Sequence, residues 1–159
     1  SCSGASTYVI SSINYSKSKG ASTVYLVTNP NPYISTEVDV IIKANTGPEV
    51  ITGSTRMKAG SATKMILNMI STTTMIKLGK VYKNLMIDLM AVNNKLIDRG
   101  IRIIMQITGL SYEKAKKKLF EAKKSVKAAI IMIKLDCDLE KANKKIKKFN
   151  GVLSKIIDE

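Results

Sequence analysis

The sequence predicts an α/β fold, in which a small parallel sheet flanked by helices is followed by an all-helical C-terminal part. Two patterns support this class. An amphipathic helical pattern in residues 8–19 precedes two short runs rich in β-branched residues. From residue 61 onward, apolar residues recur at three- and four-residue spacing, as in amphipathic helices. Apolar residues make up 45% of the 159 residues, so a packed core is expected and intrinsic disorder is not.

The first predicted element is a helix over residues 8–19. Gly20 is a plausible stop for this helix. Its apolar side is formed by Val9, Ile10, Ile13 and Ser16. In a βα unit a strand should come before such a helix, and none is present. The sequence is therefore expected to be truncated on its N-terminal side.

Two strands are predicted next. Residues 23–28 form a nearly continuous β-branched and apolar run, which is typical of a strand buried on both faces of a parallel sheet. The Asn-Pro-Asn-Pro segment at residues 29–32 ends it. Residues 38–42 predict a second strand of the same type.

The remainder is predicted to be helical. A helix from residue 61 is broken by Gly79, a second runs from residue 81 to residues 95–98, and a third covers residues 101–108 and ends at Gly109. Ser111 is a suitable N-cap for the next helix, so residues 101–135 resemble a compact three-helix unit. A further helix over residues 139–149 follows, and after Gly151 the chain has a short apolar end at residues 152–157. Most of the eight methionines fall on the apolar stripes and are expected in the core.

Composition excludes several kinds of chemistry. The chain has no histidine, so a histidine-based triad, a histidine-ligated metal and a histidine proton shuttle are ruled out for it. Cys2 and Cys137 are too few for a disulfide framework or a cysteine-only zinc site. We expect a cytoplasmic protein, because the sequence has neither a recognisable signal peptide nor an apolar run long enough to span a membrane.

The net charge is +14, and it rises from +2 in residues 1–60 to +7 in residues 110–159. A basic tail can bind nucleic acid. This tail, however, carries lysine and no arginine, and aromatic residues are scarce in it. A solvated lysine-rich surface is therefore the favoured interpretation, and no nucleic-acid or membrane partner is expected.

Residues 47–64 form the most informative stretch, GPEVITGSTRMKAGSATK. They read as a loop that leads into a helix N-terminus. Glycines permit tight turns, hydroxyl and basic side chains are plentiful, and free N–H groups at a helix start attract anions. The stretch suits a phosphorylated small molecule. A capped helix start with incidental charge remains the alternative.

This stretch resembles the signature of the N-acetylmuramic acid 6-phosphate etherase family, which is related to the glucokinase regulatory proteins within the sugar isomerase (SIS) superfamily. The resemblance continues through residues 67–72 and 75–86, Thr108-Gly109 and residues 126–130. It implies a partial SIS-type parallel sheet flanked by helices, and an all-helical C-terminal part with a small UBA-like (ubiquitin-associated-like) three-helix bundle.

The resemblance also implies a division into three parts. Residues 1–60 would be the C-terminal part of a SIS sugar-phosphate-binding domain. Residues 61–100 would be long helices that complete this domain and supply a homodimer interface, with residues 62–90 as the surface. Residues 101–159 would be the UBA-like bundle and tail.

The implied reaction cleaves the D-lactyl ether of N-acetylmuramic acid 6-phosphate to N-acetylglucosamine 6-phosphate and D-lactate, in cell-wall sugar recycling. It is an elimination across C2–C3 followed by water addition, for which carboxylates can act as acid and base. No metal or organic cofactor is implied. The catalytic glutamates of the family would lie in the missing half, so the isolated chain is expected to be inactive. A non-catalytic sugar-phosphate sensor remains the alternative.

Two sets of substrate-binding residues are implied by the resemblance. The first matches the family's second serine-rich loop at a helix start: Ser3, Gly4, Ser6 and Thr7. The family usually has proline where Thr7 stands. The second matches the signature loop: Ser54, Thr55, Arg56 and Lys58. Arg56 or Lys58 could equally pair with a carboxylate across a subunit interface. Glu49 is expected to support the site by holding the loop through backbone N–H bonds, and it is not assigned as the base.

Overall fold

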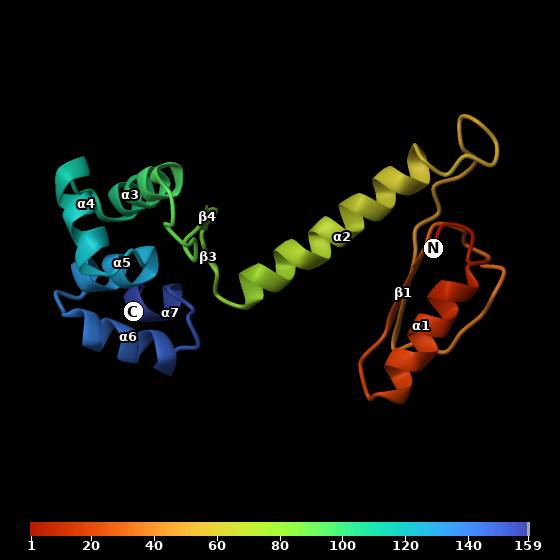
Figure 1. The fold of residues 1–159 in the computed structure, drawn as a ribbon, viewed down its shortest axis with the longest axis horizontal. Coiled ribbons are helices and arrows are strands. Elements are labelled where there is room, and N and C mark those ends of the chain that lie inside the picture. The colour runs from red at the N-terminus through yellow and green to blue at the C-terminus, as the bar shows by residue number, and fades with distance from the viewer. Residues whose placement is uncertain (159) are drawn as a thin grey trace. The chain divides into compact units, whose positions relative to one another are not determined.

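The computed structural model describes residues 1–158, in which a two-stranded parallel sheet comes first and helices dominate the rest (Figure 1). The chain divides into two compact units, Ser1–Ser71 (unit 1) and Thr72–Glu159 (unit 2). The predicted mixed α/β class is confirmed. The division at residues 60 and 100 stays a prediction.

Unit 1 begins with helix α1 (Thr7–Ser18). Its half-buried face consists of the four residues that the sequence predicts: Val9, Ile10, Ile13 and Ser16. The helix ends where expected, because Gly20 has a φ of 77°, a left-handed conformation that glycine adopts readily.

Strands β1 (Val24–Val27) and β2 (Val40–Lys43) pair in parallel, with Val24 opposite Val40. The Asp39 carboxylate fixes the start of this pairing, since it accepts hydrogen bonds from the backbone N–H of Thr23 at 2.6 Å and from its hydroxyl at 2.9 Å. These two bonds lower the pKa of Asp39.

The expected burial of both strands on both faces is wrong in part. Tyr25 and Val27 of β1 are fully buried, but Val24 is 52% exposed, and in β2 Val40 and Ile41 are 50% and 46% exposed. The reason is that, within the described residues, each of these strands has the other as its one neighbour in the sheet.

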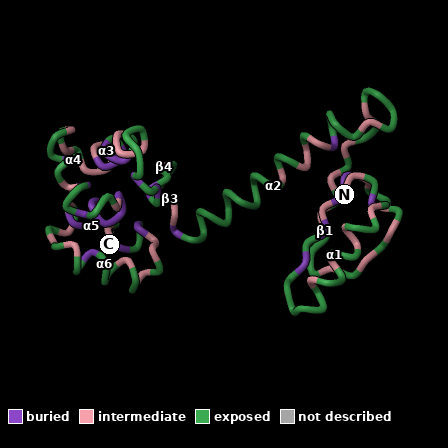
Figure 2. The backbone as a smooth tube through the Cα atoms, in the orientation of Figure 1, coloured by how far each residue is buried: buried purple, intermediate pink, exposed green. Residues whose placement is uncertain are grey.

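Helix α2 (Lys58–Lys77) is continuous over 20 residues, and the turn at Gly79 follows it as predicted. The prediction that its methionines lie in the core is wrong. Met65, Met69 and Met75 are between 45% and 64% exposed. Ala59 is the one buried residue of α2, so no core packs against these methionines. Figure 2 shows the helix as mostly exposed.

The predicted second helix, from residue 81 to residues 95–98, is also wrong. Strands β3 (Val81–Tyr82) and β4 (Leu85–Met86) form a small antiparallel hairpin, and a helix begins only at Asn94. Lys83 in the two-residue turn has a φ of 54°, which a helix does not permit. The apolar residues that suggested a helix belong instead to an extended chain in which buried and exposed positions alternate. Ile87, Leu89 and Ala91 are buried, whereas Met90 and Val92 are exposed.

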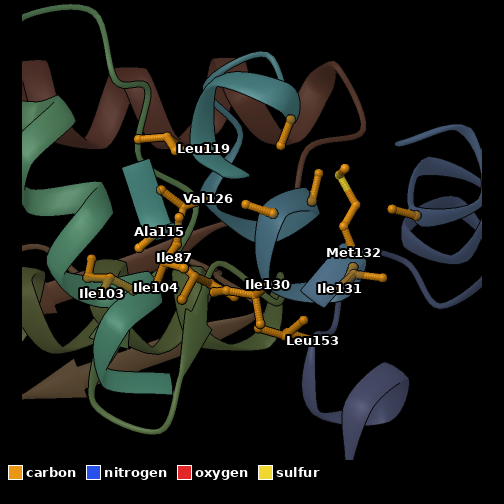
Figure 3. Close-up of a cluster of buried hydrophobic side chains, with 14 of the residues drawn as sticks. Ile87, Ile103, Ile104, Ala115, Leu119, Val126, Ile130, Ile131, Met132 and Leu153 are labelled. Carbon is orange, nitrogen blue, oxygen red and sulfur yellow. The ribbon is translucent and has the colours of Figure 1, made fainter. Parts of the chain in front are cut away.

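Unit 2 packs its remaining helices around one core: α3 (Asn94–Thr108), α4 (Tyr112–Glu121), α5 (Val126–Lys134), α6 (Leu139–Lys148) and α7 (Ser154–Ile157). Helix α5 lies at its centre, since its residues from Val126 to Met132 are buried. Side chains from α3, from α4 and from the residue before α7 converge on it, among them Ile104, Leu119 and Leu153 (Figure 3). Helices α3, α4 and α5 contact one another, as the predicted three-helix unit requires.

Local signals in the sequence explain where these helices begin and end. Asn93, Ser125 and Asp138 cap α3, α5 and α6, because each side chain accepts a hydrogen bond from the backbone N–H three residues later. Each cap contributes about 1 kcal/mol to helix stability. Gly109 closes α3 in the left-handed conformation that the sequence predicts. Within the described residues, no helix is both long and apolar enough to span a membrane.

Candidate functional site

A pocket of about 310 Å³ lies in unit 1 at the carboxyl ends of β1 and β2. In α/β proteins, ligands bind at this edge of a parallel sheet. The pocket is lined by residues from four segments: Cys2, Ser3, Thr28, Asn29, Pro30, Asn45, Thr46, Gly47, Glu49, Thr55 and Ala59. Its polar side chains carry hydroxyl and amide groups, with Glu49 as the one charged side chain, although most of the exposed lining is apolar.

The segment before α1 is held at this edge by backbone hydrogen bonds. The carbonyl of Cys2 accepts from the N–H of Asn29 at 3.0 Å, and the carbonyl of Gly4 accepts from Ile34 at 3.1 Å. Gly4 is buried and has a φ of 80°, and a Cβ at this position would lie 2.4 Å from the Cβ of Pro32. Only glycine fits here, because it lets the segment before α1 approach the loop at Pro32 closely. This close approach places Ser3 at the pocket wall.

Glu49 ties the signature loop to the start of α2. Its two carboxylate oxygens accept from the backbone N–H groups of Lys58 and Ala59, each at 3.0 Å. These hydrogen bonds, that of Ala59 first, lower the pKa of Glu49. The carboxylate is thus held ionised in the role that the sequence analysis favours, and its oxygens border the pocket.

The sequence analysis expected free N–H groups at the start of α2, where an anion could bind. The structure shows that these N–H groups already have acceptors. Besides the two N–H groups held by Glu49, that of Gly60 donates to the carbonyl of Thr55 and that of Ser61 to the carbonyl of Met57. All four N–H groups of the first turn therefore have acceptors within the chain. The start of α2 is a capped helix N-terminus, which was the alternative interpretation of this stretch.

The start of α1 differs in this respect. Ser6 occupies the N-cap position in an extended conformation, and its side chain makes no capping hydrogen bond. Thr7 is the first helical residue, where the family usually has proline. The first turn of α1 contains no acidic residue. Ser3 connects this helix start to the pocket, because its hydroxyl accepts from the N–H of Ala5 at 3.2 Å while the residue lines the pocket wall.

The structure brings together only part of the predicted site. Ser3, Glu49 and Thr55 line the pocket. Ser54 is half-buried outside it, and Arg56 is exposed and has no ion-pair partner among the described residues. Lys58 is also exposed and directs its ammonium to the carbonyl of Pro48 at 2.7 Å, so it stabilises the loop.

Sequence reasoning missed several pocket residues, namely Thr28, Asn29, Asn45 and Thr46. A signal for them was present. Thr28 follows the end of β1 directly, and Asn45 lies two residues beyond the end of β2. Because the carboxyl ends of parallel strands meet at one edge, polar residues just after two such strands are candidates for one pocket. Among the described residues, no group of three or more Cys, Asp or Glu side chains is placed to hold a metal ion.

A parallel sheet with a pocket at its carboxyl edge is typical of the class of small-ligand-binding α/β proteins. Comparison with known proteins is more specific. The chain is 47% identical over 155 residues to an N-acetylmuramic acid 6-phosphate etherase of Bacillus cereus (strain AH187), and 46% identical to one of Bacillus anthracis. Each match covers 98% of this chain and 53% of the relative. A family model, the C-terminal lid domain of glucokinase regulatory protein, matches residues 83–127.

The resemblance seen in the sequence is therefore confirmed. The chain is related over nearly its whole length to the N-acetylmuramic acid 6-phosphate etherase family, and it spans about half the length of the curated relatives that it matches. The match to a C-terminal domain model agrees with its assignment as a C-terminal portion.

Proposed function

We propose that this chain supplies part of the sugar-phosphate-binding site of an N-acetylmuramic acid 6-phosphate etherase. The protein would cleave the D-lactyl ether to N-acetylglucosamine 6-phosphate and D-lactate, as a carbon–oxygen lyase of cytoplasmic amino-sugar and peptidoglycan recycling. The observation that carries the proposal is the position of the signature-loop residues Glu49 and Thr55 at the pocket on the carboxyl edge of the sheet.

The pocket walls suit the sugar. An amino sugar presents hydroxyl groups and an N-acetyl group, which need both donors and acceptors. The hydroxyls of Ser3 and Thr55 and the amides of Asn29 and Asn45 can provide either, and the Glu49 carboxylate accepts. A volume of about 310 Å³ is at the lower end of the usual range for small-molecule sites.

The phosphate is assigned to the start of α1. Ser6 and Thr7 offer hydroxyls there, and the helix N-terminus carries a partial positive charge that is not offset by an acidic residue in its first turn. The start of α2 is a poorer candidate, since the Glu49 carboxylate already holds two of its N–H groups. Arg56 would add positive charge from the exposed part of the signature loop.

Glu49 is not proposed as the acid–base group. Proton abstraction from C2 needs a carboxylate with a pKa near the working pH. Two backbone N–H bonds hold the pKa of Glu49 below its usual range. From the resemblance to the family, we place the catalytic glutamates outside this chain, and the isolated chain is expected to bind without turnover. The fold of the whole protein would be SIS-type, with residues 101–159 containing a UBA-like bundle.

A second candidate function is that of a non-catalytic sugar-phosphate-binding regulatory protein. The match of residues 83–127 to a lid-domain model from glucokinase regulatory protein favours it. Both functions use the same pocket, so the pocket does not separate them. Both also fit a homodimer, for which the exposed methionines and isoleucines of α2 would supply the apolar surface. Neither involves a nucleic acid, a membrane or a cofactor.

The experiment is an assay of D-lactate release from N-acetylmuramic acid 6-phosphate by the full-length protein that contains this chain. Release of D-lactate with formation of N-acetylglucosamine 6-phosphate supports the etherase. Binding of the sugar phosphate in calorimetry without release of D-lactate supports the regulatory protein. Failure of a folded full-length protein to bind either sugar phosphate contradicts both.

A further inference from the structure

A pocket of about 490 Å³ in unit 2 has no role in the function proposed above. It lies between the extended segment after β4 and the turn between α4 and α5. Its lining residues come from these two stretches and from the residue before β3: Lys80, Asp88, Leu89, Met90, Ala91, Val92, Lys123, Lys124 and Ser125. A bridge between Met90 and Ser125 joins the two stretches, so the pocket wall is built on paired backbone.

The pocket is strongly positive. Three lysines line it against one carboxylate, that of Asp88. Asp88 is already engaged, with the ammonium of Lys80 at 2.5 Å and that of the buried Lys127 at 3.7 Å. The ammonium groups of Lys123 and Lys124, in contrast, have no carboxylate partner among the described residues. The ammonium of Lys124 lies 5.9 Å from the ring centroid of Phe120, a contact that holds the side chain in place without neutralising its charge.

Lys123 and Lys124 both have a backbone conformation that is unfavourable for lysine. Lys123 and Lys124 have φ values of 51° and 64°, so two consecutive residues lie in the left-handed region. Glycine adopts this conformation without strain, and a lysine there is strained by its Cβ. Both side chains are exposed, so neither contributes to the core. Strain at a pocket wall is characteristic of functional positions, and the group that distinguishes these residues from glycine is their ammonium.

We propose that this pocket binds a multiply charged phosphate-type anion, held by the ammonium groups of Lys123 and Lys124. Lysine is well suited to phosphate, because its compact ammonium acts as a point charge with three donors. Asp88 forms an ion pair with Lys80, which also lines the pocket. An organic portion of the ligand would lie against Met90 and Val92, which are 77% and 69% exposed.

The test is titration of the chain with inorganic phosphate and with pyrophosphate, followed by amide chemical shifts in nuclear magnetic resonance. Shifts should concentrate at residues 88–92 and 123–125, with pyrophosphate binding more tightly than phosphate. Binding should weaken as sodium chloride is added, because salt screens exposed charges. The variants Lys123→Gly and Lys124→Gly should each weaken binding by about fivefold, the upper range for an exposed ion pair.

The melting temperature distinguishes these glycine variants from misfolded protein, because glycine relieves the backbone strain and should raise it. Lys83→Gly is the matched control: Lys83 is also a lysine at positive φ, 54°, but lies outside this pocket. It should raise stability and leave phosphate binding unchanged. Lys123→Gln and Lys124→Gln, which remove the charge alone, should weaken binding equally. Shifts concentrated elsewhere, or unchanged binding by the Lys123 and Lys124 variants, would overturn the proposal.

Discussion

The ammonium of Lys127 in α5 donates to the carbonyl oxygen of Gly79 at 3.0 Å, which joins the turn after α2 to the centre of the unit 2 core. The side chain of Lys127 is 8% exposed, and its second partner is Asp88 at 3.7 Å. Burial lowers the pKa of Lys127, and the charge of Asp88 opposes that shift. Gly79 is also closely packed, since a Cβ there would lie 2.8 Å from the carbonyl oxygen of Gly151. Lys127 lies beside the contact between these two turns, because a Cβ at Gly151 would be 3.2 Å from its ammonium.

Replacement of Lys127 by methionine should destabilise the protein by about 1–3 kcal/mol, because the buried carbonyl of Gly79 loses its donor. Methionine keeps most of the length of the side chain, so the loss reports the ammonium rather than a cavity. Urea denaturation measures the effect. Lys114→Met, at an exposed position on α4, is the control and should change stability by less than about 0.5 kcal/mol. Equal effects of the two variants would show that the Lys127 contact contributes nothing.

Glu49→Gln should lower the melting temperature at neutral pH, because an amide is a weaker acceptor for the two N–H groups at the start of α2. The folded-state pKa of Glu49 lies below its usual 4.5. Its stabilising contribution is therefore complete above that value and is lost as the pH falls through the folded-state pKa. Melting curves from pH 7 to 3 check this. The difference between wild type and Glu49→Gln should shrink at acid pH, and a constant difference contradicts the assignment.

Gly4→Ala should destabilise unit 1 more than Gly20→Ala does. Both glycines have positive φ, 80° and 77°, so either change incurs the left-handed penalty of about 1–2 kcal/mol. Only at Gly4 does the new Cβ meet other atoms, with Pro32 at 2.4 Å, whereas nothing lies within 4 Å at Gly20. The difference between the two variants in urea denaturation measures the close packing at the pocket edge. Equal losses would mean that the loop relaxes freely.

Ile130→Ala should cost about 2–5 kcal/mol, since Ile130 is fully buried in the core of unit 2 (Figure 3). Met65→Ala on α2 should cost far less in the isolated chain, because Met65 is 64% exposed. Thermal unfolding of both variants checks this contrast. A large loss from Met65→Ala that depends on protein concentration would show that the homodimer proposed above forms in this chain as well and covers α2.

The sequence predicted the elements whose signals are local. The apolar side of α1 with its stop at Gly20, the parallel pairing of two β-branched runs, and the left-handed end of α3 at Gly109 all follow from residue spacing and from glycine. The segment from residue 81 to 93 was missed. Its hairpin turn, Lys83-Asn84, lacks glycine, and buried residues that alternate in an extended chain can mimic helical spacing.

The site was predicted in the same uneven way. The capping role of Glu49 follows from a carboxylate placed before a helix start, and the structure confirms it. The residues that follow β1 and β2 were not singled out, because their proximity depends on the topology of the sheet. The exposure of Met65 and Met69 could not be predicted either, since an apolar stripe does not reveal whether its covering surface lies within the same chain.

The most direct test of the central proposal is to map the binding of N-acetylglucosamine 6-phosphate to this chain by amide chemical shifts. Shifts at residues 3–7, 28–30, 45–47 and 55, with weakened binding by Ser3→Ala and by Asn45→Ala, would support a sugar-phosphate site at the carboxyl edge of β1 and β2. Saturable binding that leaves these residues unshifted and is unaffected by both variants would contradict it.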